Sequence, residues 1–256
     1  MRKNCLKHIT SALMMLLFTA ASAAGTITTP AEAVNSAGKQ RMFTMRLLRD
    51  YIMIGEKMQY KNPAADLQKT IASYELSQKE LMNYVTDPSL KSELDKIGVK
   101  WQEVRKMLGQ SPQKELAATY AKTAIDFREV LNTFVDHLTK ATGSSSTQSI
   151  NLSGRLRAVS QALAALYQLR AWEMPGVEKK IMIPMERFRA SLDYLESAKV
   201  TAAPMQPYLK KLEKIYRFFS VMNTAETFTP TLVIKKTDTM LNLASELTAL
   251  YVGSDK

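Results

Sequence analysis

The chain contains one 18-residue phrase twice. It reads VNSAGKQRMFTMRLLRDY over residues 34–51 and INLSGRLRAVSQALAALY over residues 150–167, an offset of 116 residues. The positions at which the two versions are identical are Asn35/Asn151, Gly38/Gly154, Arg41/Arg157, Leu47/Leu163 and Tyr51/Tyr167. Self-similarity at a fixed offset is the signature of a repeated structural unit. The phrase therefore predicts a duplicated domain with one arginine-bearing segment in each half.

Prolines preceded by capping residues mark the starts of helices on both sides of this phrase. Thr29-Pro30 begins the first helix, and Thr29 with Glu32 matches a capping box. The other pairs are Asn62-Pro63, Asp87-Pro88, Ser111-Pro112 and Thr229-Pro230. The first half is predicted to be helical over 30–60, 63–85, 88–108 and 112–141. The second half is predicted to be helical over 148–172, 178–199, 204–223 and 230–251, with Pro184 shortening or kinking its second helix.

Four helices on each side of a Gly/Ser/Thr-rich segment predict an all-α chain of two tandem four-helix bundles. The first bundle is expected over residues 30–142 and the second over 150–252. Residues 143–149 are expected to form a flexible linker, because their composition is rich in Gly and Ser.

The first residues have the pattern of a cleavable signal peptide, residues 1–23. A basic start is followed by a short apolar core over 9–20 and by the small residues Ala21-Ser22-Ala23. That core is too short to span a bilayer. The expected location is the periplasm of a bacterium.

Cysteine and histidine usage restricts the chemistry. Cleavage would remove Cys5, the only cysteine, and would leave His137 as the only histidine. Disulfides, cysteine nucleophiles and zinc sites are then excluded. The methionines at helical spacing, such as Met42 and Met45, are read as core filling and not as copper ligands. No cofactor, no metal and no enzymatic activity are expected.

The charge balance is basic, with 35 Lys and Arg against 24 Asp and Glu. This excess favours anionic ligands, acidic partners or membrane headgroups. Nucleic acid is not expected as a partner, because the chain is predicted to be exported and has no basic run interleaved with aromatic residues.

The repeated arginines are the candidate site. Arg41 falls on an otherwise apolar helical stripe, and burial of a guanidinium is costly unless something anionic or carbonyl-rich satisfies it. Arg157 lies off the leucine stripe of its helix, on a small polar face that includes Gly154 and suits close approach by another helix. Two such arginines from facing helices would hold a small oxyanion, since the guanidinium fork matches its oxygens. The alternative is that each arginine pairs with an acid. The candidate acids are Asp50, Asp126, Glu129 and Glu226.

The segment Asn35–Leu47 resembles the signature helix of the PilJ/NarX-type sensor domain. Residues 150–157 resemble the PilJ version of the same helix, and residues 230–238 resemble the last helix of that domain. This family provides the periplasmic N-terminal module of type IV pilus chemotaxis transducers and of nitrate/nitrite sensor kinases. The resemblance implies a four-helix bundle for each half. It also implies that nitrate binds between paired first helices, at the arginine after Gly-x-x. The positions carried over are Arg41, Arg157, Gly38 and Gly154, with Lys39, Arg46 and Arg155 as secondary candidates.

The expected function is an exported, sensor-like binding protein. A small oxyanion such as nitrate or nitrite would bind between the paired first helices, and a membrane-bound signalling or pilus-related partner would receive the signal. This reading is compatible with a homodimer. The alternative is a ligand-free structural or adaptor module that docks another periplasmic or membrane protein. The second phrase has Ala158 and Ala162 where the first has Met42 and Arg46, so the role of Arg157 stays open.

Overall fold

The computed structural model describes residues 26–255, and the predicted signal peptide with Cys5 lies outside this range. The described part is all-α, as predicted, and contains no strand. Its first four helices are α1 (Pro30–Gly55), α2 (Pro63–Tyr84), α3 (Pro88–Leu108) and α4 (Lys114–Thr142). The remaining elements are α5 (Ser145–Ala171), α6 (Val177–Ser197), a 3₁₀ turn (Ala203–Met205), α7 (Gln206–Thr224) and α8 (Pro230–Ser254).

Local capping explains why several helices begin where the sequence predicts. The Thr29 hydroxyl accepts a hydrogen bond from the Glu32 N–H, and the Glu32 carboxylate accepts one from the Thr29 N–H, which completes the capping box. The side chains of Asn62 and Asp87 cap α2 and α3 by accepting hydrogen bonds from the N–H groups of Ala65 and Leu90. Each side chain satisfies one of the N–H groups that a helix start leaves unpaired.

The connection between α4 and α5 differs from the predicted linker 143–149. Only Gly143 and Ser144 lie between the two helices, and residues 145–149 already belong to α5. Gly143 adopts the left-handed conformation with φ of 65°, and the Ser144 side chain caps α5. The Ser and Thr hydroxyls that suggest flexibility instead bond to main-chain carbonyls of this turn, as Thr147 does to Ser144.

Two other boundaries are corrected. α1 ends at Gly55 and not near residue 60, because the chain reverses there through Lys57, whose φ is 53°. α6 is not shortened by Pro184 but continues through it from Val177 to Ser197. Ile181 and Phe188, one turn on either side of that proline, are fully buried. Tertiary packing therefore outweighs the local cost of a proline inside the helix.

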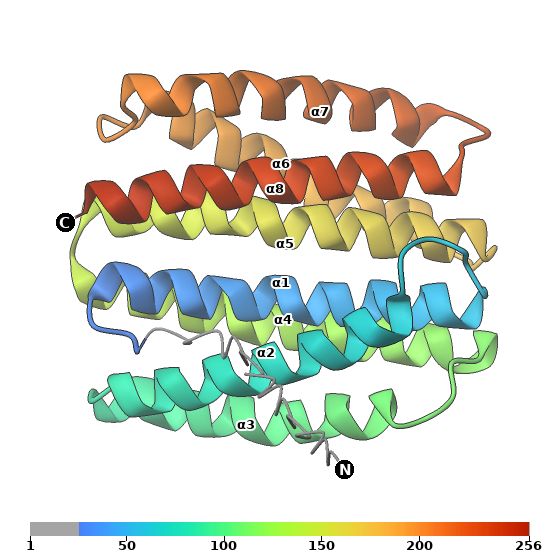
Figure 1. The fold of residues 1–256 in the computed structure, drawn as a ribbon, viewed down its shortest axis with the longest axis horizontal. Helices are drawn as coiled ribbons and strands as arrows, with labels where there is room; N and C mark the ends of the chain where they lie inside the picture. Colours follow the sequence, from blue (N-terminus) through green and yellow to red (C-terminus); the bar gives the residue numbers. More distant parts are fainter. Residues whose placement is uncertain (1–25, 256) are drawn as a thin grey trace, which may run out of the picture.

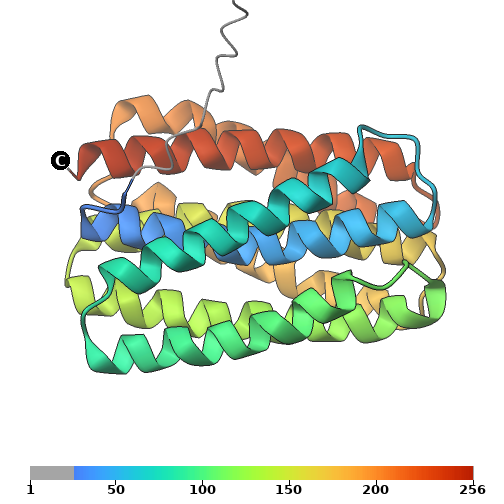
Figure 2. The ribbon, with the colours of Figure 1, turned by 60° about the horizontal axis from the view of Figure 1, so that its bottom comes forward.

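The helices form two groups of four, α1–α4 and α5–α8, which meet along α1 and α5 (Figure 1). These two helices lie side by side in the middle of the molecule and run in the same direction. Their contact is the most extensive between any two helices of the described part. The second view shows the same elongated bundle (Figure 2). One continuous hydrophobic core extends through both groups, from Ile27 to Tyr251.

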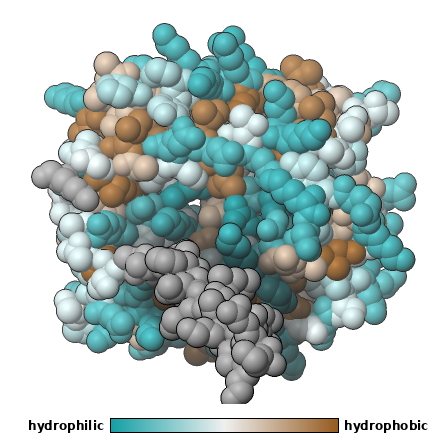
Figure 3. All heavy atoms as spheres, viewed as in Figure 1, coloured by the Kyte–Doolittle hydropathy of each residue, from teal (hydrophilic) through white to brown (hydrophobic). Residues whose placement is uncertain are grey.

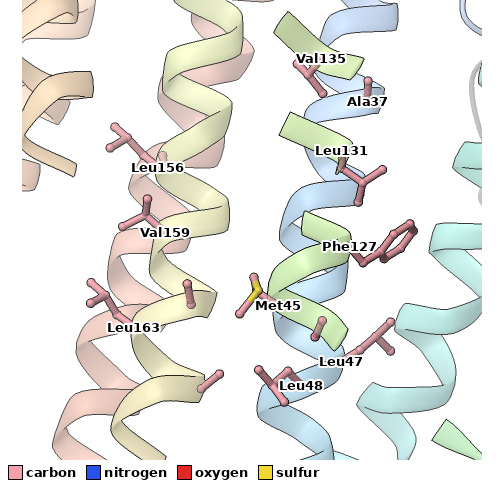
Figure 4. Close-up of a cluster of buried hydrophobic side chains, with 14 of the residues drawn as sticks. Ala37, Met45, Leu47, Leu48, Phe127, Leu131, Val135, Leu156, Val159 and Leu163 are labelled. Carbon is pink, nitrogen blue, oxygen red and sulfur yellow. The ribbon is translucent and has the colours of Figure 1, made fainter. Parts of the chain in front are cut away.

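The leucine stripe of α5 leaves room for α1 on the opposite side. Leu156, Val159 and Leu163 point away from α1, towards the other helices of their own group (Figure 4). Met45 of α1 points towards α5 in the same view. α5 is thus buried on both sides, and the side that faces α1 is the one that carries Gly154 and Arg157. We call this contact the α1–α5 seam.

Candidate functional site

The two repeated arginines meet in the α1–α5 seam. Arg41 is completely buried, and Arg157 is 4% exposed. The Nη2 atoms of both guanidinium groups lie within 3.5 Å of the point where a Cβ on Gly38 would stand. The two atoms are therefore at most twice that distance apart. Gly38 and Gly154 provide this space, because a Cβ on Gly154 would come within 2.9 Å of the Arg157 Nη2.

Each arginine donates hydrogen bonds to the repeated asparagine of the opposite helix. Arg41 Nη2 donates to the main-chain oxygen of Asn151 over 3.0 Å, and Nη1 donates to Asn132 Oδ1 on α4 over 3.3 Å. Arg157 Nη2 donates to Asn35 Oδ1 over 2.8 Å, and more weakly to the Asn35 main-chain oxygen. The Asn and Arg that recur in the sequence are therefore partners across the seam. This role of the asparagines was missed at the sequence level, although their recurrence at identical spacing was a signal for it.

None of the acids considered as alternative partners pairs with these arginines. Asp50 pairs with Arg49, Asp126 with Lys122, and Glu129 with Arg128 and Arg187. Glu226 is exposed in the turn before α8. Within residues 26–255, the hydrogen bonds of Arg41 and Arg157 all go to neutral oxygens. Both cations thus lie in the seam without a carboxylate partner from this part of the chain.

Burial and mutual repulsion shift the pKa values of the pair. The pKa of Arg41 is lowered to about 9, chiefly by burial and also by the nearby charges of Arg155 and Arg157, while the charge of Asp136 opposes them. Burial lowers the pKa of Arg157 to about 10. Both groups therefore stay protonated at neutral pH. The Nε atom of each is buried and has no partner among the described residues, which leaves donors for an additional acceptor.

The surroundings of Arg41 hold it firmly. Asn132, its side-chain partner, donates to Glu129 over 3.1 Å. Glu129 in turn receives two hydrogen bonds from Arg187 of α6, of 2.8 and 2.6 Å. Burial would raise the pKa of Glu129, but the hydrogen bonds from Arg187 and Arg128 lower it to about 2. Arg41 is therefore linked to α4, α5 and α6 through a charged network.

Arg155, the other arginine of the phrase at residues 150–167, lies on the side of the seam that holds Arg41. It pairs with Asp136 of α4 over 3.2 Å. The Asn151 side chain donates to the same carboxylate oxygen over 2.8 Å. Arg155 is thus near Arg41 but neutralised by an acid.

The surroundings of Arg157 are more open. Asn35, its partner, lines a groove of about 360 Å³ between α1 and α2. Lys39, which corresponds to Arg155 in the repeat, also lines this groove and is exposed. Desolvation and the charge of Arg157 lower the pKa of Lys39, and the charge of Glu80 raises it. The two sides of the seam are therefore unequal, although the two phrases are similar.

Arg46 is not brought to the arginine pair. It lies in a second polar cluster of the seam, where the charges of Arg49 and Asp50 act on it. Arg49 pairs with Asp50 over 2.6 Å and donates to Gln161 of α5 over 2.8 Å. This cluster was missed by sequence reasoning, because the second phrase has Ala165 and Leu166 at the positions of Arg49 and Asp50.

The fold and the seam define a helical-bundle domain with a buried cationic centre. Residues 27–127 match the model of the PilJ family, the N-terminal domain of type IV pili methyl-accepting chemotaxis transducers. The match covers α1 to α3 and the first half of α4. No curated protein and no solved structure matches the chain.

The family gives the general class of function. PilJ domains are sensor-type domains of chemotaxis transducers; they are typically periplasmic, are non-enzymatic in general and signal to a membrane-associated partner. In the described part of this chain, no helix has the length and apolar character needed to cross a membrane.

Proposed function

We propose that the protein is an exported sensor that binds a small oxyanion, such as nitrate or nitrite, at the α1–α5 seam. Arg41 and Arg157 hold the anion, and Gly38 and Gly154 allow the guanidinium groups to approach. In this proposal the second group of helices is a second copy of the PilJ domain. The paired first helices of a two-domain sensor then lie within one chain, so no homodimer is needed to complete the site.

The observation that carries the proposal is the pair of buried guanidinium groups without a carboxylate partner within residues 26–255. Two like charges that are close together and out of water destabilise each other and the fold. An anion between them would offset the repulsion and use the unpaired donors. A bound anion would also connect α1 to α5, because it would contact an arginine of each helix. It would thereby connect the two groups of helices. We expect a membrane-bound signalling partner to read that coupling.

Isothermal calorimetry with nitrate, nitrite and acetate, in a chloride-free buffer, tests the proposal. The wild-type protein should bind at least one of these anions, and Arg41→Ala and Arg157→Ala should abolish binding. Arg105→Ala is the matched control, because it removes a partly exposed arginine that pairs with Glu75 on the protein surface. Circular dichroism establishes that each variant is folded. Arg157→Lys keeps the charge without the fork and should bind weakly. Absence of heat from every anion would refute the proposal.

The adaptor function remains a second candidate, because large apolar side chains are exposed on α6 and α7. Met182, Ile183 and Val221 are 46%, 46% and 69% exposed. A hydrogen bond from Asn223 to the Met182 sulfur connects the two helices there. On the face shown in Figure 3, hydrophobic side chains are scattered among hydrophilic ones. Replacing Met182 and Val221 by Ser should abolish a pull-down with a membrane partner if docking is the function. The same change should leave anion binding intact.

A further inference from the structure

The groove between α1 and α2 lies directly beside the more open arginine. It is lined by Asn35, Ser36 and Lys39 of α1 and by Ser73, Leu76 and Ser77 of α2, among others. Its volume of about 360 Å³ is within the range of small-molecule sites. It is also many times the ~30 Å³ that one water molecule occupies in the liquid. A nitrate ion would leave most of this space empty.

Asn35 separates the groove from Arg157. Its Oδ1 accepts the 2.8 Å hydrogen bond from Arg157 Nη2, so the amide oxygen occupies a position that a ligand oxygen could take. On the other side of the seam the corresponding partner of Arg41 is the main-chain oxygen of Asn151. A side chain can rotate away, but a helix carbonyl cannot leave without moving the helix. Of the two contacts between a repeated arginine and a repeated asparagine, only the one at Arg157 goes chiefly to a side chain, which a ligand can displace without moving the backbone.

The charges of the groove limit the ligand to one negative charge. Lys39 is exposed in the groove, and Arg157 lies behind Asn35. Two carboxylates, Glu32 and Glu80, line the same groove. Glu32 accepts hydrogen bonds from Thr28 and Thr29 at the start of α1. A second negative charge on the ligand would face these carboxylates, so dianions such as phosphate esters are disfavoured.

The remaining lining combines hydroxyl groups with an apolar surface. Ser36 and Ser77 share a 2.9 Å hydrogen bond across the floor of the groove. Leu76 is 44% exposed there, and Phe43 forms part of the same lining. Apolar surface beside a cation suits a ligand that has an anionic head and a short hydrocarbon part.

We infer that the α1–α2 groove binds a small monocarboxylate with a short apolar chain, whose carboxylate displaces the Asn35 side chain from Arg157 and also contacts Lys39. The chain of the ligand packs against Leu76 and Phe43. This inference rests on the proposed anion-binding function; it names the ligand class and the open side of the same site. Asn35 is then a positioning residue, which occupies the arginine until the ligand arrives.

Calorimetry with acetate, butyrate and nitrate tests the inference on the mature protein. Butyrate should bind about tenfold more tightly than acetate, because its two additional methylene groups leave water. Ser73→Phe fills the groove and should abolish butyrate binding. Ser220→Phe is the matched control, since Ser73 and Ser220 both donate to the carbonyl four residues earlier on an exposed helix face.

A second variant tests the displacement of Asn35. Asn35→Asp should place a carboxylate on Arg157, weaken butyrate binding at least tenfold and leave the thermal unfolding temperature unchanged or raised. Asn223→Asp on α7 adds the same charge away from the groove and should bind butyrate as the wild type does.

The outcomes separate this inference from the proposed function. If nitrate and acetate bind through Arg157 but butyrate has no advantage and Ser73→Phe is silent, the groove inference is wrong and the anion site stands. If butyrate binds equally well to Arg157→Ala, the placement of its carboxylate is wrong. If none of the three anions binds, the groove inference fails, and the proposed function fails with it if nitrite also gives no heat.

Discussion

Replacement of Gly154 by Ala tests the position of the Arg157 guanidinium. In the structure a Cβ at this position would come within 2.9 Å of Arg157 Nη2. That atom is the one that donates to Asn35. The new methyl group must therefore displace the donor of the hydrogen bond that holds the arginine in the seam.

Two opposing terms set the magnitude. Ala is favoured over Gly inside a helix by up to about 1 kcal/mol. Loss of a hydrogen bond from a charged group costs about 1.5–3 kcal/mol. Gly154→Ala should therefore lower the free energy of unfolding by about 0.5–2 kcal/mol, in spite of its better helix propensity. Gly38→Ala should cost less, because its nearest contacts, at 3.4 and 3.5 Å, require only a small shift.

Urea unfolding followed by circular dichroism measures the effect as a change in midpoint at constant slope. Gly98→Ala is the matched control, since a Cβ there meets nothing within 4 Å, and it should stabilise α3 by about 0.5–1 kcal/mol. The reasoning is refuted if Gly154→Ala is as stable as Gly98→Ala. That result would mean that the guanidinium does not lie against this glycine.

Three further changes test other parts of the structure. Burial raises the pKa of Glu56 to about 7, so its charged form opposes folding as the pH rises above about 5. Glu56→Gln should then add about 1 kcal/mol of stability at pH 8 and almost none at pH 4, measured by urea unfolding. Burial would raise the pKa of Glu129, but hydrogen bonds from Arg187 first and then Arg128 lower it to about 2. Its contribution to the free energy of unfolding is therefore present above pH 4.5 and is lost as the pH falls towards 2. Glu129→Gln should cost about 1–2 kcal/mol at pH 7 in the same assay, a value reduced because the carboxylate is partly exposed. Gly55→Ala should lower stability by about 1–3 kcal/mol in thermal unfolding, because its Cβ would lie 2.6 Å from the Trp172 ring.

For each of these three predictions, one result would contradict the reasoning. A Glu56→Gln variant with the same gain at pH 4 and pH 8 would show that this carboxylate is solvated in the folded state. A Glu129→Gln variant that is equally destabilised at pH 2.5 and pH 7 would show that the charge of Glu129 is not what matters. For Gly55→Ala, a stability equal to that of Gly98→Ala would place the Trp172 ring elsewhere.

The fold was largely predictable, because helix starts depend on local chemistry. Thr29, Asn62 and Asp87 cap their helices through side chains that accept a hydrogen bond from the N–H group three residues later. Such contacts can be inferred from neighbours in the sequence. The short connection at residues 143–149 and the continuation of α6 through Pro184 have a different cause. There, packing against the rest of the molecule outweighed the local preference for flexibility or for a helix break.

The site was predictable only in part. The repeated phrase identified Arg41 and Arg157, and the small residues around Gly154 indicated a close helix contact. The sequence could not show that Asp50, Asp126 and Glu129 pair with other cations, because these choices depend on which helix faces meet. The sequence also could not show that the groove opens beside Arg157 and not beside Arg41, because the repeated partners of the two arginines, Asn35 and Asn151, are identical.

The sequence by itself determined the all-helical class, most of the helix starts and the two arginines of the seam, because helix capping and apolar periodicity act over a few residues. Only the tertiary structure decided what surrounds those arginines. The parallel packing of α1 against α5 places Asn35 on Arg157 and the main chain of Asn151 on Arg41. These contacts join residues more than a hundred positions apart, and their geometry follows from the packing of whole helices and from no local preference.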